Sequence, residues 1–216
     1  MAKLFQGRSL SVVRWLLARP NRSWTLSAMH DSSGVSVPFV GRVFQTLEAA
    51  AYVDRKRGAT GLNDRDGLLD AWAAAPAPQT DEVQGVFLPG LQALLRKVQV
   101  GKAPPPHALT AEAAADFVSP LARYSRMEMY VRDADEWLAW LKLTAVPKGG
   151  NVVLIESADP GVFSAVERKG ALQLVCRPQL YVDLKRRGGA AAEAADSLKR
   201  SGKLWTEGTL ETSPAP

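Results

Sequence analysis

The chain has 216 residues, of which 46% are hydrophobic and 23% are charged. This composition is typical of a folded globular protein, and it excludes a disordered or collagen-like chain. The length is sufficient for two small domains. Because Cys176 is the only cysteine, neither an intrachain disulfide nor a cysteine-rich metal cluster is possible. The two histidines are far apart, so the sequence predicts no metal site and no cofactor.

No stretch of the sequence approaches the roughly 18 apolar residues that a membrane-spanning helix needs. The first ten residues, MAKLFQGRSL, lack the apolar core and cleavage site of a signal peptide. We therefore expect a cytoplasmic protein that does not contact a membrane.

The positive charge is concentrated in the N-terminal third of the chain. The formal net charge is +5. Residues 1–75 contain ten Lys or Arg and six Asp or Glu, whereas the rest of the chain contains 17 and 16. An excess placed in this way favours a phosphate-binding module at the N-terminus.

The spacing of apolar residues predicts helices at about 9–19 and 25–30, and a third that begins at Ser36. Ser9 and Ser36 are the expected N-caps, and Pro38 suits a first helical turn. Residues 31–35 are predicted as a turn. A strand-like Tyr-Val pair (52–53), a basic glycine-containing loop (54–61) and a fourth helix from 63 or 64 follow. Three helices and a basic hairpin are typical of a winged helix-turn-helix.

In a winged helix-turn-helix the third helix lies in the major groove of DNA. Arg42 could then bond to a guanine and Gln45 to an adenine, while Phe39 could touch a thymine methyl group. Ser36 and the first-turn amides could hold a phosphate. Arg55, Lys56 and Arg57 in the hairpin could grip the DNA backbone or the minor groove. The outward positions on the third helix include Pro38, Phe39, Arg42, Gln45 and Thr46, and Ser36 precedes them as the N-cap.

Strands and helices alternate after the Ala- and Pro-rich stretch at 73–78. We expect strands at 83–88, 127–131, 151–155 and 172–175, the strand at 127–131 being half-buried. Helices are expected at 90–99, 111–117, 133–143 and after Pro178, the last one broken near 188–189 and resuming over 190–200. Thr110 is the expected cap of the second of these helices. The predicted fold class is mixed α+β: a winged helix (1–75), a linker (76–82), an α/β domain (83–205) and a flexible tail (206–216).

Two stretches resemble a known family. Residues 52–72, ending in LNDRDGLLDAW, resemble the end of the winged helix of AbiEi-type antitoxins. Residues 151–200 resemble the end of their C-terminal domain, with the motifs PQLYVDL (178–184) and EAADSL (193–198). Ala51 stands where these winged helices commonly have glycine.

The resemblance implies a transcriptional repressor that binds operator DNA and autoregulates its operon. It also implies that the protein counters a nucleotidyltransferase-like toxin without forming a stable complex with it. The second domain is then expected to serve antitoxin action or oligomerisation, for which a homodimer is the candidate assembly. A general regulator with no toxin beside it is an alternative within the same family.

The sequence offers no convincing catalytic set. Glu156 ends a strong strand as a nuclease carboxylate would, but the following residues lack the lysine of such sites. Asp183, where the resembling family also has an acid, is expected to cap its helix or to pair with Arg186 or Arg187 on the helix surface. Cys176 is expected to be a buried small hydrophobe. We therefore predict a protein that is not an enzyme.

A second basic surface is a further candidate for nucleic-acid contact. It comprises Lys185, Arg186, Arg187, Lys199 and Arg200. Solvated helix ends are the simpler explanation of these residues, because cations are favoured near helix C-termini. Two other function classes stay open. One is a nucleic-acid-processing enzyme targeted by its winged helix, and the other is an adaptor that uses the winged fold to bind protein.

Overall fold

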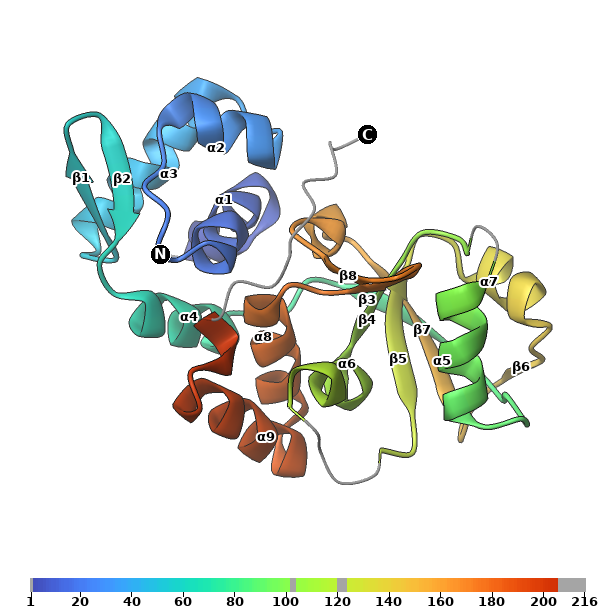
Figure 1. Ribbon diagram of the computed structural model, residues 1–216. Coiled ribbons are helices and arrows are strands. Elements are labelled where there is room, and N and C mark those ends of the chain that lie inside the picture. Colours follow the sequence, from blue (N-terminus) through green and yellow to red (C-terminus); the bar gives the residue numbers. More distant parts are fainter. Residues whose placement is uncertain (1, 102–103, 120–123, 206–216) are drawn as a thin grey trace.

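The computed structural model describes residues 2–101, 104–119 and 124–205. Its N-terminal helices and hairpin gather on one side, and a mixed sheet with its helices lies on the other (Figure 1). The predicted mixed α+β class is confirmed, since the described residues form helices, a two-stranded sheet and a seven-stranded sheet. The tail expected at 206–216 lies outside the described residues.

Helices and one hairpin make up the N-terminal part. The helices expected at 9–19, 25–30 and from Ser36 are present. The elements are η1 (Ala2–Phe5), α1 (Gly7–Ala18), α2 (Leu26–Ser33), α3 (Val37–Ala49), β1 (Val53–Lys56), β2 (Ala59–Leu62) and α4 (Arg65–Ala74).

Two local predictions in this part are wrong. Ser9 is not an N-cap, because α1 begins earlier and Ser9 is buried inside the helix. The turn predicted at 31–35 is shorter, because α2 continues to Ser33 and ends on Gly34 at φ 68°. Thr25 caps α2 by accepting a hydrogen bond from the Ala28 amide. Ser36 does occupy the N-cap position of α3, although its side chain makes no capping hydrogen bond.

A small aromatic core holds the hairpin against the helices. Trp15, Trp24 and Phe44 are buried, as predicted. Trp24 also exchanges two backbone hydrogen bonds of 2.8 Å with Thr60 of β2. The hairpin is therefore attached to the segment between α1 and α2 and does not project alone.

Seven short strands form the sheet of the C-terminal part in the order β6-β3-β7-β5-β4-β9-β8. The pairs β5–β7 and β4–β9 are parallel, and the other neighbours are antiparallel. The strands are β3 (Thr80–Gly85), β4 (His107–Thr110), β5 (Met127–Val131), β6 (Ala145–Val146), β7 (Val152–Ser157), β8 (Glu167–Lys169) and β9 (Leu172–Leu174).

Helices lie on both sides of this sheet: α6, α8 and α9 on one side and α5 and α7 on the other (Figure 1). All five residues of β5 are therefore buried, which corrects the half-buried strand expected there. β3 begins at Thr80, inside the expected linker. The helices, with the break near 188–189 as predicted, are α5 (Leu91–Val100), α6 (Ala111–Val118), α7 (Ala134–Leu141), η2 (Pro160–Phe163), α8 (Arg177–Arg187), α9 (Gly189–Arg200) and η3 (Lys203–Trp205).

A buried arginine joins the two parts. The side chain of Arg14, from α1, has no exposed surface. It donates to Asp159 Oδ2 at 2.6 Å and to Gln179 Oε1 at 2.8 and 3.2 Å, and its guanidinium lies 5.3 Å from the centre of the Trp72 ring. Any side chain at Gly161 would collide with Arg14, because a Cβ there would lie 2.2 Å from Nη1. α1 is thus fixed to η2 and α8.

Contacts between α4 and α8 extend this joint. Tyr181 donates a 2.7 Å hydrogen bond to Asp70, which also accepts one from Lys199. Arg186 donates to the backbone carbonyls of Trp72 and Ala75 at 3.2 and 3.0 Å. These bonds attach the last N-terminal helix to the helices of the C-terminal part.

We expect Arg14→Ala to lower the free energy of unfolding by about 3–5 kcal/mol, because Asp159 would stay buried without its partner. Arg14→Leu combined with Asp159→Asn should recover part of this loss. Urea unfolding followed by circular dichroism measures both. Arg8→Ala, at an exposed position of the same helix, is the control. If Arg14→Ala loses no more stability than Arg8→Ala, the ion pair does not hold α1 in place.

Ala51 lies between α3 and the hairpin in a left-handed conformation, with φ 59°. This conformation costs an L-residue about 1–2 kcal/mol, whereas glycine adopts it freely. Ala51→Gly should therefore raise the free energy of unfolding by about 1 kcal/mol. Ala50→Gly, at φ −90°, is the matched control and should lower stability. A decrease for both variants would contradict the expected strain.

Candidate functional site

One face of α3 is open to solvent along its length. The stripe formed by Val40, Val43, Phe44 and Leu47 is buried. Pro38, Arg42 and Gln45 are exposed, and their spacing of four and then three residues places them on one face of the helix. The predicted outward direction of Arg42 and Gln45 is therefore confirmed.

The remaining candidate side chains on α3 differ in their exposure and in their contacts within the protein. Ser36 is exposed at the start of the helix. Phe39 is half-buried, and the Arg42 guanidinium lies 5.2 Å from the centre of its ring. Thr46 is exposed, but its hydroxyl donates to the Arg42 carbonyl at 3.0 Å. Thr46 is thus engaged by its own helix, a common use of threonine inside a helix.

The hairpin places its cations beside the C-terminal end of α3. Arg55 Nη1 lies 3.6 Å from Glu48 Oε2 of that helix. Lys56 Nζ lies 3.5 Å from Asp54 on the same strand, and both side chains are more than half exposed. Such solvent-exposed pairs contribute little to stability, so a phosphate could replace the carboxylate.

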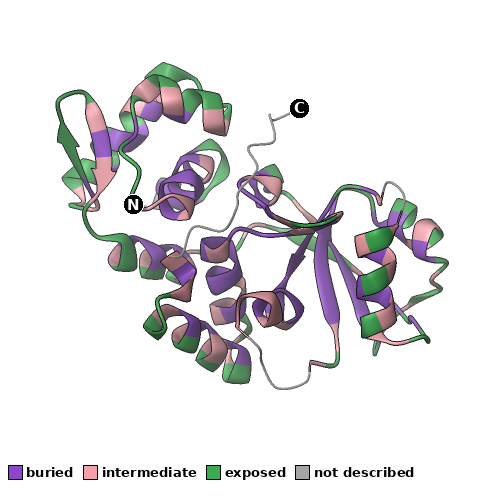
Figure 2. Cartoon of the chain, in the orientation of Figure 1, coloured by how far each residue is buried: buried purple, intermediate pink, exposed green. Residues whose placement is uncertain are grey.

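Arg57 lies at the tip of the hairpin. It has φ 51° and is followed by Gly58 at φ 81°, so both residues of the two-residue turn are left-handed, as the twist of a hairpin favours. No ion pair of Arg57 occurs among the described residues. The hairpin is exposed along β1 (Figure 2).

Arg22 is a further exposed cation near the hairpin, and it was not identified from the sequence. It is exposed, and its guanidinium lies 4.2 Å from the centre of the Trp24 ring, next to the bridge between Trp24 and β2. A lone arginine in a loop carries no sequence signal, because its position depends on the pairing of Trp24 with Thr60.

The second basic surface is largely occupied by internal contacts. Lys185 pairs with Asp196, and Lys199 pairs with Asp66 and Asp70. Arg186 is bonded to α4 carbonyls, and Arg187 pairs with the buried Glu128. Arg200 is exposed at the end of α9. A role for these residues in nucleic-acid contact stays a prediction. Of the five, Arg200 is the one for which no internal partner is seen among the described residues.

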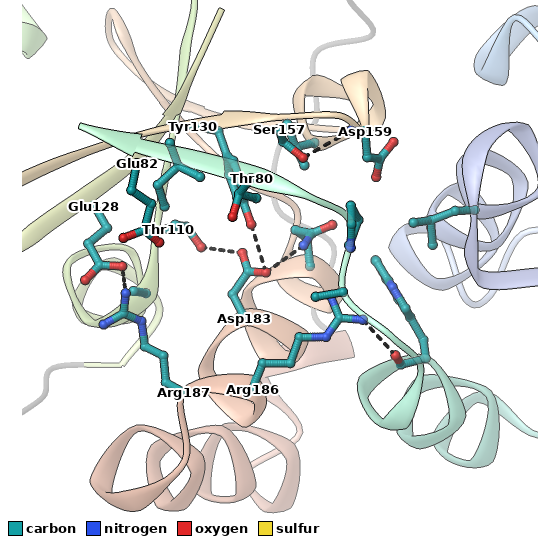
Figure 3. Close-up of a pocket in the computed structure, with 18 residues that line it drawn as sticks. Thr80, Glu82, Thr110, Glu128, Tyr130, Ser157, Asp159, Asp183, Arg186 and Arg187 are labelled. Carbon is teal, nitrogen blue, oxygen red and sulfur yellow. Dashed lines mark hydrogen bonds and ion pairs between the residues drawn. The ribbon is translucent and has the colours of Figure 1, made fainter. Parts of the chain in front are cut away.

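Asp183 does not lie on the helix surface, which corrects the expectation that it caps α8 or pairs with Arg186 or Arg187. Its carboxylate points into a pocket between α8 and the sheet (Figure 3). It accepts hydrogen bonds from Thr110 at 2.6 Å, Gln179 at 2.7 Å and Tyr130 at 3.1 Å. Burial raises the pKa of Asp183, and the three donors act in the opposite direction.

The role of Thr110 shows why the cluster around Asp183 could not be predicted from the sequence. It occupies the N-cap position of α6, as predicted, yet its hydroxyl donates to Asp183 and makes no capping bond. Tyr130 points to the same carboxylate from β5, and its pKa is raised well above the ordinary value by burial and by the charge of Asp183. The sequence carries no signal for this meeting, because the three residues lie on different elements.

Two further candidates have structural surroundings. Glu156 Oε1 accepts a 2.6 Å hydrogen bond from the Ala134 amide and so holds the start of α7. Cys176 is buried, as predicted, and burial raises the pKa of its thiol to about 11.

Comparison with known protein families, with curated proteins and with solved structures finds no match for this chain. Among the described residues, no helix has both the length and the hydropathy to cross a bilayer. Within the same residues, no group of three or more His, Cys, Asp or Glu is placed to hold a metal ion.

Proposed function

We propose that the chain binds double-stranded DNA through α3 and the β1–β2 hairpin, in the manner of a winged helix-turn-helix. The observation that carries this proposal is the shared position of two exposed features. Arg42 and Gln45 face outward on α3, and the Arg55–Glu48 contact brings the cationic hairpin beside the same helix. A helix that reads base edges and a hairpin that contacts phosphates require this arrangement.

The helix lengths suit this role. The connection between α2 and α3 is residues 34–36, so the two helices lie close together as a helix-turn-helix unit. α3 has 13 residues, which amounts to more than three turns for the major groove. Its exposed face carries an arginine and a glutamine, side chains that form bidentate bonds with guanine and adenine.

We further propose that the protein is a transcriptional repressor of the AbiEi type, acting on the operator of its own operon. This part of the proposal rests on the resemblance of residues 52–72 and 151–200. The countering of a nucleotidyltransferase-like toxin rests on the same resemblance. Co-expression with such a toxin, with growth as the readout, tests that role separately from DNA binding.

The first test concerns base recognition. Sequence preference is obtained by selection from random duplexes, and DNA upstream of the coding sequence is tested alongside. We expect Arg42→Ala to reduce discrimination at one base pair by about 1–3 kcal/mol, because a bidentate contact to a base is lost. Arg96→Ala, an exposed arginine on α5, is the matched control and should leave the preference unchanged.

The second test concerns the phosphates. Arg55→Ala combined with Arg57→Ala should weaken binding to all duplexes and lower the slope of log K against log salt by about two, because each lost phosphate contact removes about one. Fluorescence anisotropy at several salt concentrations measures the slope. Arg96→Ala, at an exposed position of α5, should leave it unchanged. Equal losses for the Arg42 and hairpin variants, without a change in sequence preference, would contradict the roles assigned here.

A further inference from the structure

The pocket that contains Asp183 has walls from both parts of the protein. Its volume is about 190 Å³. Strands β3, β4, β5 and β7 form one side, and α8 lies opposite (Figure 3). Leu10 of α1 and Trp72 of α4 complete the lining, together with Ala77 and Pro78 of the segment that connects the two parts. A cavity of about 150 Å³ accepts benzene, so this one accepts a molecule with a six-membered ring and a short substituent.

Acidic groups outnumber basic groups around this pocket. Four carboxylates line it, from Glu82, Glu128, Asp159 and Asp183, against two guanidinium groups, from Arg186 and Arg187. Arg14, which is bonded to Asp159 just behind the lining, is a third cation. One negative charge is therefore left over when all groups are ionised.

The two basic groups of the lining are already engaged. Arg187 pairs with Glu128, whose side chain is 1% exposed. Arg186 directs a nitrogen to the carbonyls at the end of α4, with distances of 3.2 and 3.0 Å. An anionic ligand would have to displace these bonds and approach the unpaired carboxylates.

Two carboxylates of the pocket lack an ion pair within the described part of the chain. Asp183 accepts hydrogen bonds from the neutral donors Thr110, Tyr130 and Gln179. The charge of Arg186 also acts on it, although the two side chains form no ion pair. A carboxylate has about four acceptor positions, so three donors leave one for a ligand. Glu82 is exposed at the pocket and forms no hydrogen bond with any described residue, although the charge of Arg187 interacts with it. Figure 3 shows its carboxylate directed toward Glu128.

We propose that this pocket binds a small organic cation, namely a primary amine or amidine on a compact apolar body. The charged nitrogen lies among the carboxylates of Asp183 and Glu82. The apolar body packs against Trp72, Ile155 and Val162, which also line the pocket. A charge-assisted hydrogen bond to a partly desolvated carboxylate supplies the selectivity for a cation over a neutral analogue. This site is independent of the proposed DNA-binding face.

Isothermal titration calorimetry of the full chain at pH 7 tests the proposal with three probes of the same size: benzylamine, benzyl alcohol and benzoate. We expect saturable one-to-one binding of benzylamine, at least tenfold weaker binding of benzyl alcohol, and no binding of benzoate. Benzoate that binds as tightly as benzylamine would overturn the charge assignment. Absence of benzylamine binding would overturn the site.

Variants locate the probe. Glu82→Gln and Asp183→Asn remove one negative charge each with little change of shape, and each should weaken benzylamine binding roughly tenfold. Glu193→Gln, exposed on α9 outside the lining, is the matched control and should bind benzylamine as the unmodified chain does. Asp183→Asn alters a buried network, so the folding of this variant is checked by circular dichroism. If Asp183→Asn does not fold, the benzylamine affinity of Glu82→Gln decides the outcome. Unchanged benzylamine affinity in folded Glu82→Gln and Asp183→Asn would overturn the assigned position.

Discussion

The arrangement of the whole molecule depends on the buried ion pair between Arg14 and Asp159. A guanidinium with no exposed surface loses its hydration, and its attraction to one carboxylate does not necessarily offset that loss. Gln179 and the ring of Trp72 supply the additional contacts. Because these partners come from the N-cap of η2, from α8 and from α4, Arg14 has all of them only when α1 is seated against the C-terminal part. Its Nη1 finds no hydrogen-bond partner among the described residues. α3 packs on α1. The contacts of Arg14 therefore also determine where the exposed face of α3 lies relative to the C-terminal part.

Gln179 makes the joint and the pocket one continuous network. Its carbonyl oxygen accepts from Arg14, and its amide nitrogen donates to Asp183. Arg14 can only donate and an ionised Asp183 can only accept, so the two neighbours fix the orientation of the amide. Such hydrogen bonds hold their members in place, because breaking one would leave a polar group unpaired in a low-dielectric interior, which is costly. The carboxylate that faces the pocket is therefore held by the same residue that helps to fix α1.

The sequence was informative where side-chain direction follows from local periodicity. The outward position of Arg42 and Gln45 could be predicted because the buried stripe on α3 determines the opposite face. Thr110 and Asp183 show where local rules fail. A threonine before a helix normally caps it, and an aspartate near arginines normally pairs with them, yet the two side chains bond to each other across 73 positions of sequence. The fold class needed only the pattern of strands and helices, whereas the pocket needed the order of the strands in space, which no local pattern encodes.

The distribution of paired charges also separates two surfaces that look alike in the sequence. Both 55–57 and 185–187 are runs of three cations. The second run forms the last turn of α8, and all three of its side chains are bonded within the protein. Their partners are the carboxylates of Asp196 and the buried Glu128 and the backbone carbonyls at the end of α4. The first run lies on a two-stranded hairpin with one face in solvent, where only weak surface pairs are within reach. Counting charges along the chain cannot distinguish these cases. The partners of each run do distinguish them. The cations of the hairpin remain open to a polyanion, whereas those of 185–187 are bonded within the protein and leave the pocket open to a cation.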